Sequence, residues 1–259
     1  MAFDGAGPIT EAVVLMAGSG SRLRVSGAAV PKPLLPVLGR PLICYLLENL
    51  AKAGVGILHA VVGWESERLL AGLAPLVPNG MDLHPIFNHE WKKQNGISLL
   101  AAESHLAAPF LLTMADHIFD FALIERLVRQ ADPARLNLAV DRKIDSIFDL
   151  DDAMKVQTRK GRVAAIGKDL TLYDAIDTGA FLCPPEIFRY LKAAQRGGDC
   201  SLADGVGLMA ADGKVRAIDI GEAWWQDVDT PAMRARAEEE LRNLAQFKMG
   251  DLARRRPRR

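Results

Sequence analysis

The first stretch whose residue types could do chemistry is VVLMAGSGSRL, residues 13–23, where an apolar run leads into a Gly-Ser-Gly-Ser turn and an arginine. Gly18 and Gly20 let the backbone approach an anion closely, and successive N–H groups in such a turn form an anion site. A dinucleotide fingerprint is excluded because Leu23 stands at its third glycine, and no Walker A lysine follows. The turn therefore predicts a phosphate loop, with a tight turn that binds nothing as the alternative. The loop residues are Met16, Ala17, Gly18, Ser19 and Gly20.

Two cations follow this turn. Arg22 comes directly after it, and Lys32 lies between two prolines in VPKPLLPVLGRPL, residues 30–42. The prolines restrict the backbone and lower the entropic cost of directing the Lys32 ammonium group. A lone lysine would be a solvated surface charge, but the combination predicts charge neutralisation around a phosphate.

Two aspartates follow apolar segments: Asp116 comes after LLTMA, and Asp227 lies in WWQDVDT. An aspartate at the end of a strand is commonly a turn residue or a helix N-cap. In a chain with a phosphate loop, two such carboxylates predict a Mg²⁺ ion held by Asp116, Asp227 and triphosphate oxygens. Asp229 competes for this role, and we favour Asp227 because Asp229 is well placed to cap the next helix.

Together these stretches resemble the pattern LxAGxGxRL…PKPL of the sugar-type nucleotidyltransferases, which join a nucleoside triphosphate to a phosphorylated acceptor and release pyrophosphate. Met16 replaces the usual alanine, and the stretch between Arg22 and Pro31 is longer than usual. The resemblance implies that the two aspartates carry the metal. The catalytic residues are then Arg22, Lys32, Asp116 and Asp227.

The segment KKQNGISLLAAE, residues 92–103, resembles the part of this family that reads the nucleobase. Gly96 would permit close approach of the ring, while Asn95 and Ser98 offer hydrogen bonds to the base or the ribose. A helix N-cap at Asn95 or Ser98 is the alternative.

Further stretches, MADHIFD, AVDRK, GRVAAIGKDL, YDAIDTGAFL and WWQDVDT, occur in the order typical of CTP:inositol-1-phosphate cytidylyltransferases. This resemblance implies transfer of CMP from CTP to inositol 1-phosphate, giving CDP-inositol and pyrophosphate. Carboxylates and short polar groups would accept or donate hydrogen bonds at the ring hydroxyls, and cations would meet the acceptor phosphate. The implied acceptor-side residues are Asp141, Arg142, Lys168, Asp177, Thr178 and Gly179.

Other acceptors stay open. Phosphocholine and aminoethylphosphonate cytidylyltransferases use similar loops, and a choline site would need an aromatic cage, for which Trp91, Trp224 and Trp225 are available. A sugar 1-phosphate is another alternative. A nucleotide-binding relative without activity is disfavoured because all four implied catalytic residues are present.

These residues must be positioned by alternating strands and helices. Apolar runs predict strands at 11–17, 56–63, 81–87, 109–115 and 135–140, and helical spacing predicts helices at 41–54, 65–74, 97–107 and 121–131. A hairpin turning at Lys160-Gly161 is predicted over 153–168, then an extended stretch at 175–183. Helices near 185–196 and 201–211, a strand at 214–220 and a helix capped by Asp229 or Thr230 follow.

This order predicts an α/β protein with a Rossmann-like, GT-A-like nucleotidyltransferase fold. We expect a mixed, mostly parallel central sheet with helices on both faces and a small β-rich acceptor-side subregion. The chain is expected to form a single domain over 1–252. Its parts are a nucleotide-binding half at about 10–140, an acceptor-binding half at about 141–230, a C-terminal helix at about 230–248 and a basic tail at 253–259.

Composition limits the partners. The chain has 32 basic and 32 acidic residues, a balance that argues against a general nucleic-acid binder. Three cysteines without a CxxC pair fit a reducing cytoplasm, and no apolar run is long enough to cross a membrane. Relatives in the resembled family are often fused to a membrane phosphotransferase, and we expect the stand-alone form because nothing apolar follows Leu252. A homodimer and a weak membrane contact through the basic tail are compatible with the sequence.

Overall fold

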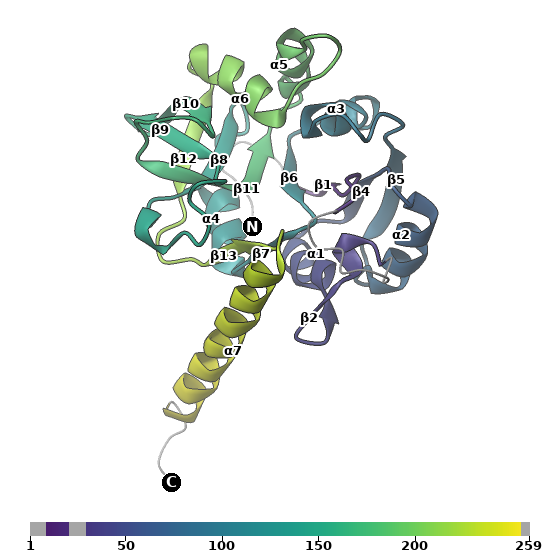
Figure 1. The fold of residues 1–259 in the computed structure, drawn as a ribbon, viewed down its shortest axis with the longest axis vertical. Coiled ribbons are helices and arrows are strands. Elements are labelled where there is room, and N and C mark those ends of the chain that lie inside the picture. The colour runs from purple at the N-terminus through teal and green to yellow at the C-terminus, as the bar shows by residue number, and fades with distance from the viewer. Residues whose placement is uncertain (1–8, 21–29, 255–259) are drawn as a thin grey trace.

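The protein, seen in a computed structural model that describes residues 9–20 and 30–254, is built around one nine-stranded sheet (Figure 1). Its strands are β1 (Glu11–Leu15), β4 (Ile57–Val62), β5 (Asp82–Phe87), β6 (Phe110–Met114), β8 (Leu136–Asp141), β9 (Lys155–Arg159), β10 (Arg162–Gly167), β11 (Ala175–Cys183) and β12 (Val215–Asp219). The order across the sheet is β5-β4-β1-β6-β11-β8-β12-β10-β9. Two short pairs lie outside it: β2 (Pro36–Val37) with β3 (Arg40–Pro41), and β7 (His117–Phe119) with β13 (Trp225–Asp227).

The sheet is parallel in its first half and mixed in its second. Strands β5, β4, β1 and β6 are parallel neighbours, and β11 runs antiparallel to both β6 and β8. At the far end β9 pairs with β10 and also with the start of β11, so that five strands form a closed ring of pairings. The expected mixed α/β sheet is confirmed, and its antiparallel pairings gather around β11 and the β9–β10 hairpin.

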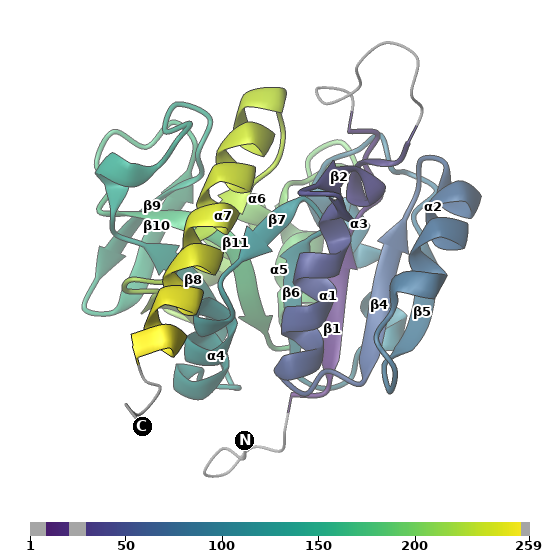
Figure 2. The ribbon, with the colours of Figure 1, turned by 90° about the horizontal axis from the view of Figure 1, so that it is seen from below.

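Helices cover both faces of the sheet. The helices are α1 (Leu42–Lys52), α2 (Ser66–Leu73), α3 (Asn95–Leu100), α4 (Phe121–Gln130), α5 (Ile187–Ala194), α6 (Leu202–Ala211) and α7 (Pro231–Arg254). Because side chains alternate along a strand, Val13 and Leu15 of β1 face the cluster with α3, α5 and α6, whereas Ala12 and Val14 face α1, α2 and α4. Figure 2 shows α1 on the near side of the sheet. Helices on both faces were predicted and are confirmed.

Several local predictions can be compared directly. The Lys160-Gly161 turn is confirmed, with φ of 51° and 73° at these residues, the positive values that a type I′ hairpin needs. The predicted helix over 97–107 is wrong in extent, because α3 ends at Leu100 and a single 3-10 turn, Glu103–His105, follows. Ala102 and Leu106, which follow the end of α3, are still buried in the core.

The last helix, α7, begins at Pro231 and extends to Arg254, six residues beyond the predicted end. Its start packs Met233 and Ala237 into the protein, and Ala237 lies with Val37 and Leu42 in a small apolar cluster. Figure 1 shows the rest of α7 running away from the sheet. No helix in the described part of the chain is long and apolar enough to span a membrane. Residues 255–259 of the basic tail lie outside the described residues.

Thr230 caps α7. The backbone N–H of Met233 donates to Thr230 Oγ1 at 3.2 Å, three residues into the helix, as an N-cap requires. Asp229 therefore does not cap the helix, and its carboxylate is directed elsewhere.

This assignment predicts that Thr230→Ala lowers the free energy of unfolding by about 1 kcal/mol, because the Met233 N–H loses its acceptor. Thr230→Ser keeps the hydroxyl group and should retain most of the stability. Urea unfolding of the three proteins measures the difference. Equal unfolding midpoints for Thr230→Ala and the wild type would contradict the cap.

Candidate active site

Two adjoining cavities open where the parallel strands β1 and β6 end, the edge at which open α/β sheets bind ligands. The smaller cavity, of about 250 Å³, contains the predicted phosphate loop, and the larger, of about 470 Å³, contains most of the predicted acceptor side. Asp116 and Asp229 line both. The smaller cavity is lined by Leu15, Met16, Gly18, Gly20, Lys32, Pro33, Ala115, Asp116 and Asp229.

Lys32 is the centre of the smaller cavity. Its ammonium group donates to Asp116 Oδ2 at 2.6 Å and also to Asp229 Oδ1, while its side chain is only 11% exposed. Burial alone would lower the pKa of Lys32, but the two carboxylates outweigh it and raise the pKa above its usual value. Lys32 therefore stays positively charged at neutral pH.

The glycine turn reaches this lysine because Gly20 lacks a side chain. Gly20 has φ of +60°, and a Cβ atom there would lie 2.7 Å from Cβ of Lys32. The structure thus brings the predicted loop and the predicted lysine together. Arg22 falls outside the described residues, and its predicted role stays a prediction.

Asp116 connects the two cavities. Its second oxygen accepts from Nδ1 of His117 at 2.6 Å. Burial would raise the pKa of Asp116, but Lys32 and His117 outweigh it and hold the pKa well below its usual range. For His117, burial acts to lower the pKa, and Asp116 overcomes this and raises it. His117 was missed from the sequence, although it stands beside Asp116 in MADHIFD.

The strand pair β7–β13 positions Asp227, the last residue of β13, and Asp229 follows two residues later. Asp227 lies opposite His117 in this pair, and the N–H of Val228 donates to the carbonyl of Asp116 at 2.8 Å. Burial, followed by the charges of Asp229 and Asp116, raises the pKa of Asp227. We favoured Asp227 over Asp229 because Asp229 was expected to cap α7, and that reason is wrong. The role of Asp227 as a metal ligand stays a prediction. Asp229, the competing candidate, instead contacts Lys32.

The donor set here suits a hard cation. Three carboxylates, from Asp116, Asp227 and Asp229, line the larger cavity, and oxygen is the ligand atom that Mg²⁺ prefers. Among the described residues no group of three or more Asp, Glu, His or Cys side chains is already arranged to hold a metal. This is compatible with Mg²⁺, because Mg²⁺ is commonly bound through one or two carboxylates and completed by substrate phosphates.

The predicted nucleobase segment is held mainly by protein contacts. Asn95 Oδ1 accepts from the N–H of Leu202 at 2.8 Å, and Ser98 Oγ accepts from Nδ2 of Asn88 at 3.0 Å. A Cβ atom on Gly96 would lie 2.6 Å from the carbonyl oxygen of Cys200, so the close approach is made by the chain itself. The alternative of a side-chain cap is wrong, because α3 starts after Gln94 without one. Asn95 still lines the larger cavity, and base contacts stay a prediction.

The acceptor-side residues divide into two groups. Asp141, Lys168, Asp177 and Gly179 line the larger cavity, with Lys168 ion-paired to Asp152. Thr178 does not, because its buried hydroxyl donates to the carbonyl of Ala139 at 2.9 Å.

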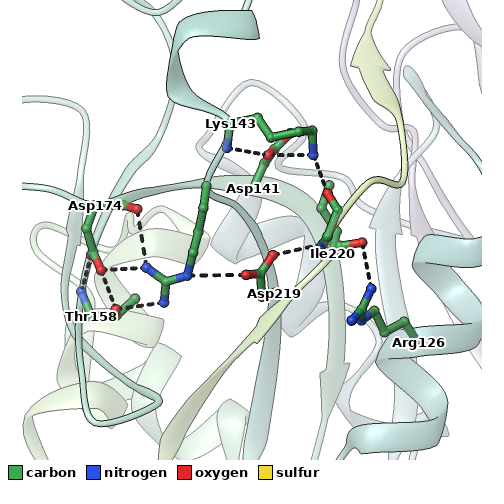
Figure 3. A network of polar contacts seen from close by, with 9 residues as sticks. Arg126, Asp141, Lys143, Thr158, Asp174, Asp219 and Ile220 are labelled. Carbon is green, nitrogen blue, oxygen red and sulfur yellow. Dashed lines mark hydrogen bonds and ion pairs between the residues drawn. The ribbon is translucent and has the colours of Figure 1, made fainter.

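Arg142 also lies outside this lining. Its guanidinium donates to Asp174 at 2.6 Å and to Thr158 at 3.0 Å. Figure 3 shows Asp174 and Thr158 side by side. The structure therefore corrects the expectation that Thr178 and Arg142 face the acceptor. Alternation along β11 turns Thr178 away from the cavity, and the carboxylate of Asp174, in the residue before β11, holds Arg142 outside the lining.

Gly179 lets β11 approach His117. It has φ of +74°, and a Cβ atom there would lie 2.6 Å from Nε2 of His117. The N–H of Gly179 donates to Asp177 Oδ1 at 2.7 Å, which directs that carboxylate. Burial raises the pKa of Asp177 to about 6, with the Gly179 N–H and His117 opposing the shift.

Sequence reasoning also missed several cavity-lining side chains. Lys143 and Phe148 come from the segment after β8, and Met233 and Arg236 come from α7. Lys143 stands in AVDRK, two residues after the predicted Asp141, and α7 begins two residues after Asp229, so position in the sequence was the available signal for these residues. Distant packing decides the rest.

Comparison with known proteins gives concordant results. Residues 12–148 match the family described as the MobA-like NTP transferase domain. The bifunctional IPC transferase and DIPP synthase of Rubrobacter xylanophilus is 36% identical over 223 residues, covering 85% of this chain and 49% of the relative. The CMP-5'-(3-aminopropyl)phosphonate synthase of Streptomyces rubellomurinus is 32% identical over 245 residues, covering 88% of this chain and 38% of the relative. The chain spans about half the length of the bifunctional relatives it matches.

A solved structure agrees over nearly the whole chain. The inositol-1-phosphate CTP transferase from T. maritima has a TM-score of 0.78 to this protein at 27% sequence identity. The match covers 90% of this chain and 95% of that one. The fold expected from the sequence is therefore confirmed.

The raised pKa of Asp177 predicts how stability depends on pH. In the folded chain Asp177 titrates near pH 6, and in the unfolded chain at about pH 4. The folded chain holds the extra proton between these values, so this carboxyl makes stability fall as pH rises from about 4 to about 6. Asp177→Asn should therefore be more stable than the wild type at pH 8, by the order of 2 kcal/mol, and equal to it near pH 4.

Asp174 provides the matched control. Burial acts to raise its pKa, but hydrogen bonds from Thr158 and Arg142 outweigh burial and lower it. Asp174→Asn should therefore lose stability at pH 8. Urea midpoints at pH 4 and pH 8 for both variants check the signs, and an Asp177→Asn variant that is less stable at pH 8 would contradict the assignment.

Proposed function

The chain belongs to the MobA-like NTP transferase domain family, and we propose on this basis that it transfers CMP from CTP to inositol 1-phosphate, giving CDP-inositol and pyrophosphate. The observation that carries the choice of substrates is the likeness, over 90% of the chain, to an inositol-1-phosphate CTP transferase. The two adjoining cavities supply a place for each substrate.

The smaller cavity suits the triphosphate. Gly18 and Gly20 bring backbone close to the charged end of Lys32, and an anion bound there would compete with Asp116 and Asp229 for the ammonium group. Lys32 thus holds its charge in place before the nucleotide binds, which limits the reorganisation needed during reaction. Arg22 is proposed to add a second positive charge.

The larger cavity suits a phosphorylated polyol. Asp177 and Gly179 line it beside His117, so a carboxylate can accept hydrogen bonds from ring hydroxyls near the reacting phosphate. Lys168 lies on the same lining with its charge paired to Asp152. We propose that this pair opens to meet anionic groups of the acceptor.

The reaction needs no general base. An oxygen of the acceptor phosphate forms a bond to the α-phosphorus of CTP, the bond from that phosphorus to the bridging oxygen breaks, and pyrophosphate leaves with the electron pair. The acceptor phosphate is anionic near neutral pH and already nucleophilic. The protein must bring two polyanions into line and neutralise their charge, and Lys32 is placed to do so.

Mg²⁺ is proposed as the cofactor, held by Asp116 and Asp227, because their oxygens fit it. When bound it neutralises charge on the triphosphate and stabilises the leaving pyrophosphate. The chain's own contribution is to fix the two carboxylates. Pairing of β7 with β13 sets their separation, and Lys32 and His117 keep Asp116 ionised.

A second acceptor class is favoured by the lining of the larger cavity. Trp224, Trp225 and Phe148 line it together with the carboxylates of Glu222 and Asp149, a combination that suits an ammonium group. Trp91, the third tryptophan considered from the sequence, does not line it. An aminoalkylphosphonate is therefore the alternative acceptor, and a relative named for such a product matches 88% of the chain.

Three sequence-based expectations remain proposals about the whole protein. They are a cytoplasmic location, a homodimer, and a weak membrane contact through the basic tail. The described residues do not include the end of that tail.

An acceptor panel tests the proposed function. Purified protein with CTP and Mg²⁺ should release pyrophosphate rapidly with inositol 1-phosphate, more slowly with 2-aminoethylphosphonate or glucose 1-phosphate, and not after chelation of the metal. The product is identified by mass spectrometry as CDP-inositol. Faster turnover with the aminophosphonate would replace the proposal by its alternative, and release with none of these acceptors would overturn both.

Substitution of Lys32 tests the charge assignment. If Lys32 stabilises charge that develops on the triphosphate, Lys32→Ala should lower kcat and kcat/KM together by about 100-fold. Lys192→Ala is the matched control, because Lys192 is an exposed lysine paired with Glu103, and neither residue lines the two cavities. A rise confined to the KM for CTP would make Lys32 a ground-state binding residue instead.

A further inference from the structure

The loop between β12 and β13 leads directly to Asp227, and other elements hold its backbone. Lys143 donates to the carbonyls of Gly221 at 2.6 Å and Ala223 at 3.3 Å. Arg126 of α4 donates to the carbonyl of Ile220 at 3.4 Å (Figure 3). The path of the loop is therefore set by cations from two neighbouring elements.

Three donors from the protein engage Asp141 in this arrangement. Its Oδ1 accepts from both the backbone N–H and the ammonium group of Lys143, each at 2.8 Å, and its Oδ2 accepts from the indole N–H of Trp225 at 3.0 Å. The carboxylate side chain is only 3% exposed. The Lys143 ammonium has three acceptors for its three N–H bonds. Asp141 thus borders the larger cavity, but its carboxylate is engaged by donors from the protein itself.

The indole of Trp225, which is hydrogen-bonded to Asp141, is connected to the Asp116 carboxylate through the imidazole ring of His117. Trp225 stacks on His117 with ring centroids 6.0 Å apart and planes only 9° from parallel. His117 in turn donates to Asp116 at 2.6 Å. An unbroken series of contacts therefore runs from Lys143 and Asp141 to Asp116.

We propose that Asp141 and Lys143 are positioning residues, which hold Trp225 against His117 and thereby fix the direction of the Asp116 carboxylate. This replaces the expectation that Asp141 binds an acceptor hydroxyl. Its kinetic readout rests on the proposed function, while its structural readout does not. A displaced catalytic group of about 1 Å can cost about 100-fold in rate, so a remote pair can act strongly without touching substrate.

The kinetic experiment separates positioning from binding. In Asp141→Asn the amide N–H₂ group faces donors that it cannot accept from, so the indole or the ammonium loses its partner. We expect kcat to fall about 10- to 100-fold while the KM for the acceptor changes less than about threefold. Lys143→Met should act likewise, and Lys192→Met, which breaks a remote lysine–carboxylate pair, should leave kcat unchanged.

Trp225→Phe keeps a ring for the stack but removes the N–H donor, and its loss of kcat should be smaller than that of Trp225→Ala. Because Asp141 acts through Trp225, the double variant Asp141→Asn/Trp225→Phe should be no slower than Asp141→Asn alone. Independent, multiplicative losses would overturn the proposal. So would an Asp141→Asn variant with normal kcat and a raised acceptor KM, the result expected of a hydroxyl ligand.

A spectroscopic measurement tests the contact without any substrate. The difference in tryptophan emission between the wild type and Trp225→Phe reports the emission of Trp225 alone. The same difference, measured between Asp141→Asn and Asp141→Asn/Trp225→Phe, should be shifted in wavelength and stronger. The reason is that the indole is then released from Asp141 and His117. An unchanged difference spectrum would overturn the proposal. If the wild type fails to release pyrophosphate, the proposed function fails, and this measurement still decides the contact. If Asp141→Asn does not fold, Lys143→Met provides the same two readouts.

Discussion

The buried ammonium group of Lys32 is the interaction on which the rest of the site depends. It joins Asp116, 84 residues away, to Asp229, 197 residues away, in a place where its side chain is only 11% exposed. Charges there are screened less than in water, so the pairing is strong and also costly to break. Lys32, together with His117, outweighs burial and holds the pKa of Asp116 low. Burial, with the charges of Asp229 and Asp116, raises the pKa of Asp227, and His117 and Lys32 oppose this shift. Lys32 thus favours the ionised form of both carboxyl groups at the junction of the two cavities.

Close backbone approach is the second requirement. Gly20 and Gly179 both have positive φ, and each leaves space that a methyl group would fill, against Lys32 in one case and against His117 in the other. The direction of β11 makes the second approach available. Because β11 runs antiparallel between β6 and β8, its beginning lies at the edge where those strands end, so Asp177 and Gly179 arrive beside Asp116. A parallel strand at this position would have placed them at the opposite edge.

The linings of the two cavities suit ligands of different chemistry. The smaller offers glycine backbone and the ammonium group of Lys32 beside two carboxylates and suits a polyphosphate, whereas the larger combines carboxylates with aromatic side chains. Carboxylates accept hydrogen bonds from hydroxyls and attract ammonium groups equally well, so they do not by themselves choose between a polyol and an amine. That choice falls to shape and to the aromatic faces. Asp141, Lys143 and Trp225 contribute to this wall while connecting it to the carboxylate at the reaction centre.

The sequence by itself determined the alternation of strands and helices, the β9–β10 turn, the glycine loop and the lysine between prolines. These are local properties: apolar periodicity, backbone restriction by proline and the freedom of glycine act within a few residues. The sequence also indicated that Asp116 and Asp227 belong together, through resemblance to a family rather than through geometry. Only the tertiary structure decided that Thr230 caps α7 and Asp229 meets Lys32, that Thr178 and Arg142 turn away from the cavity, and that Asp141 is taken up by Lys143 and Trp225. The contacts of Thr230 with Met233 and of Asp141 with Lys143 are local. The others depend on which donor or acceptor a polar side chain meets 32 to 197 residues away along the chain, and a linear pattern of residue types does not contain that pairing.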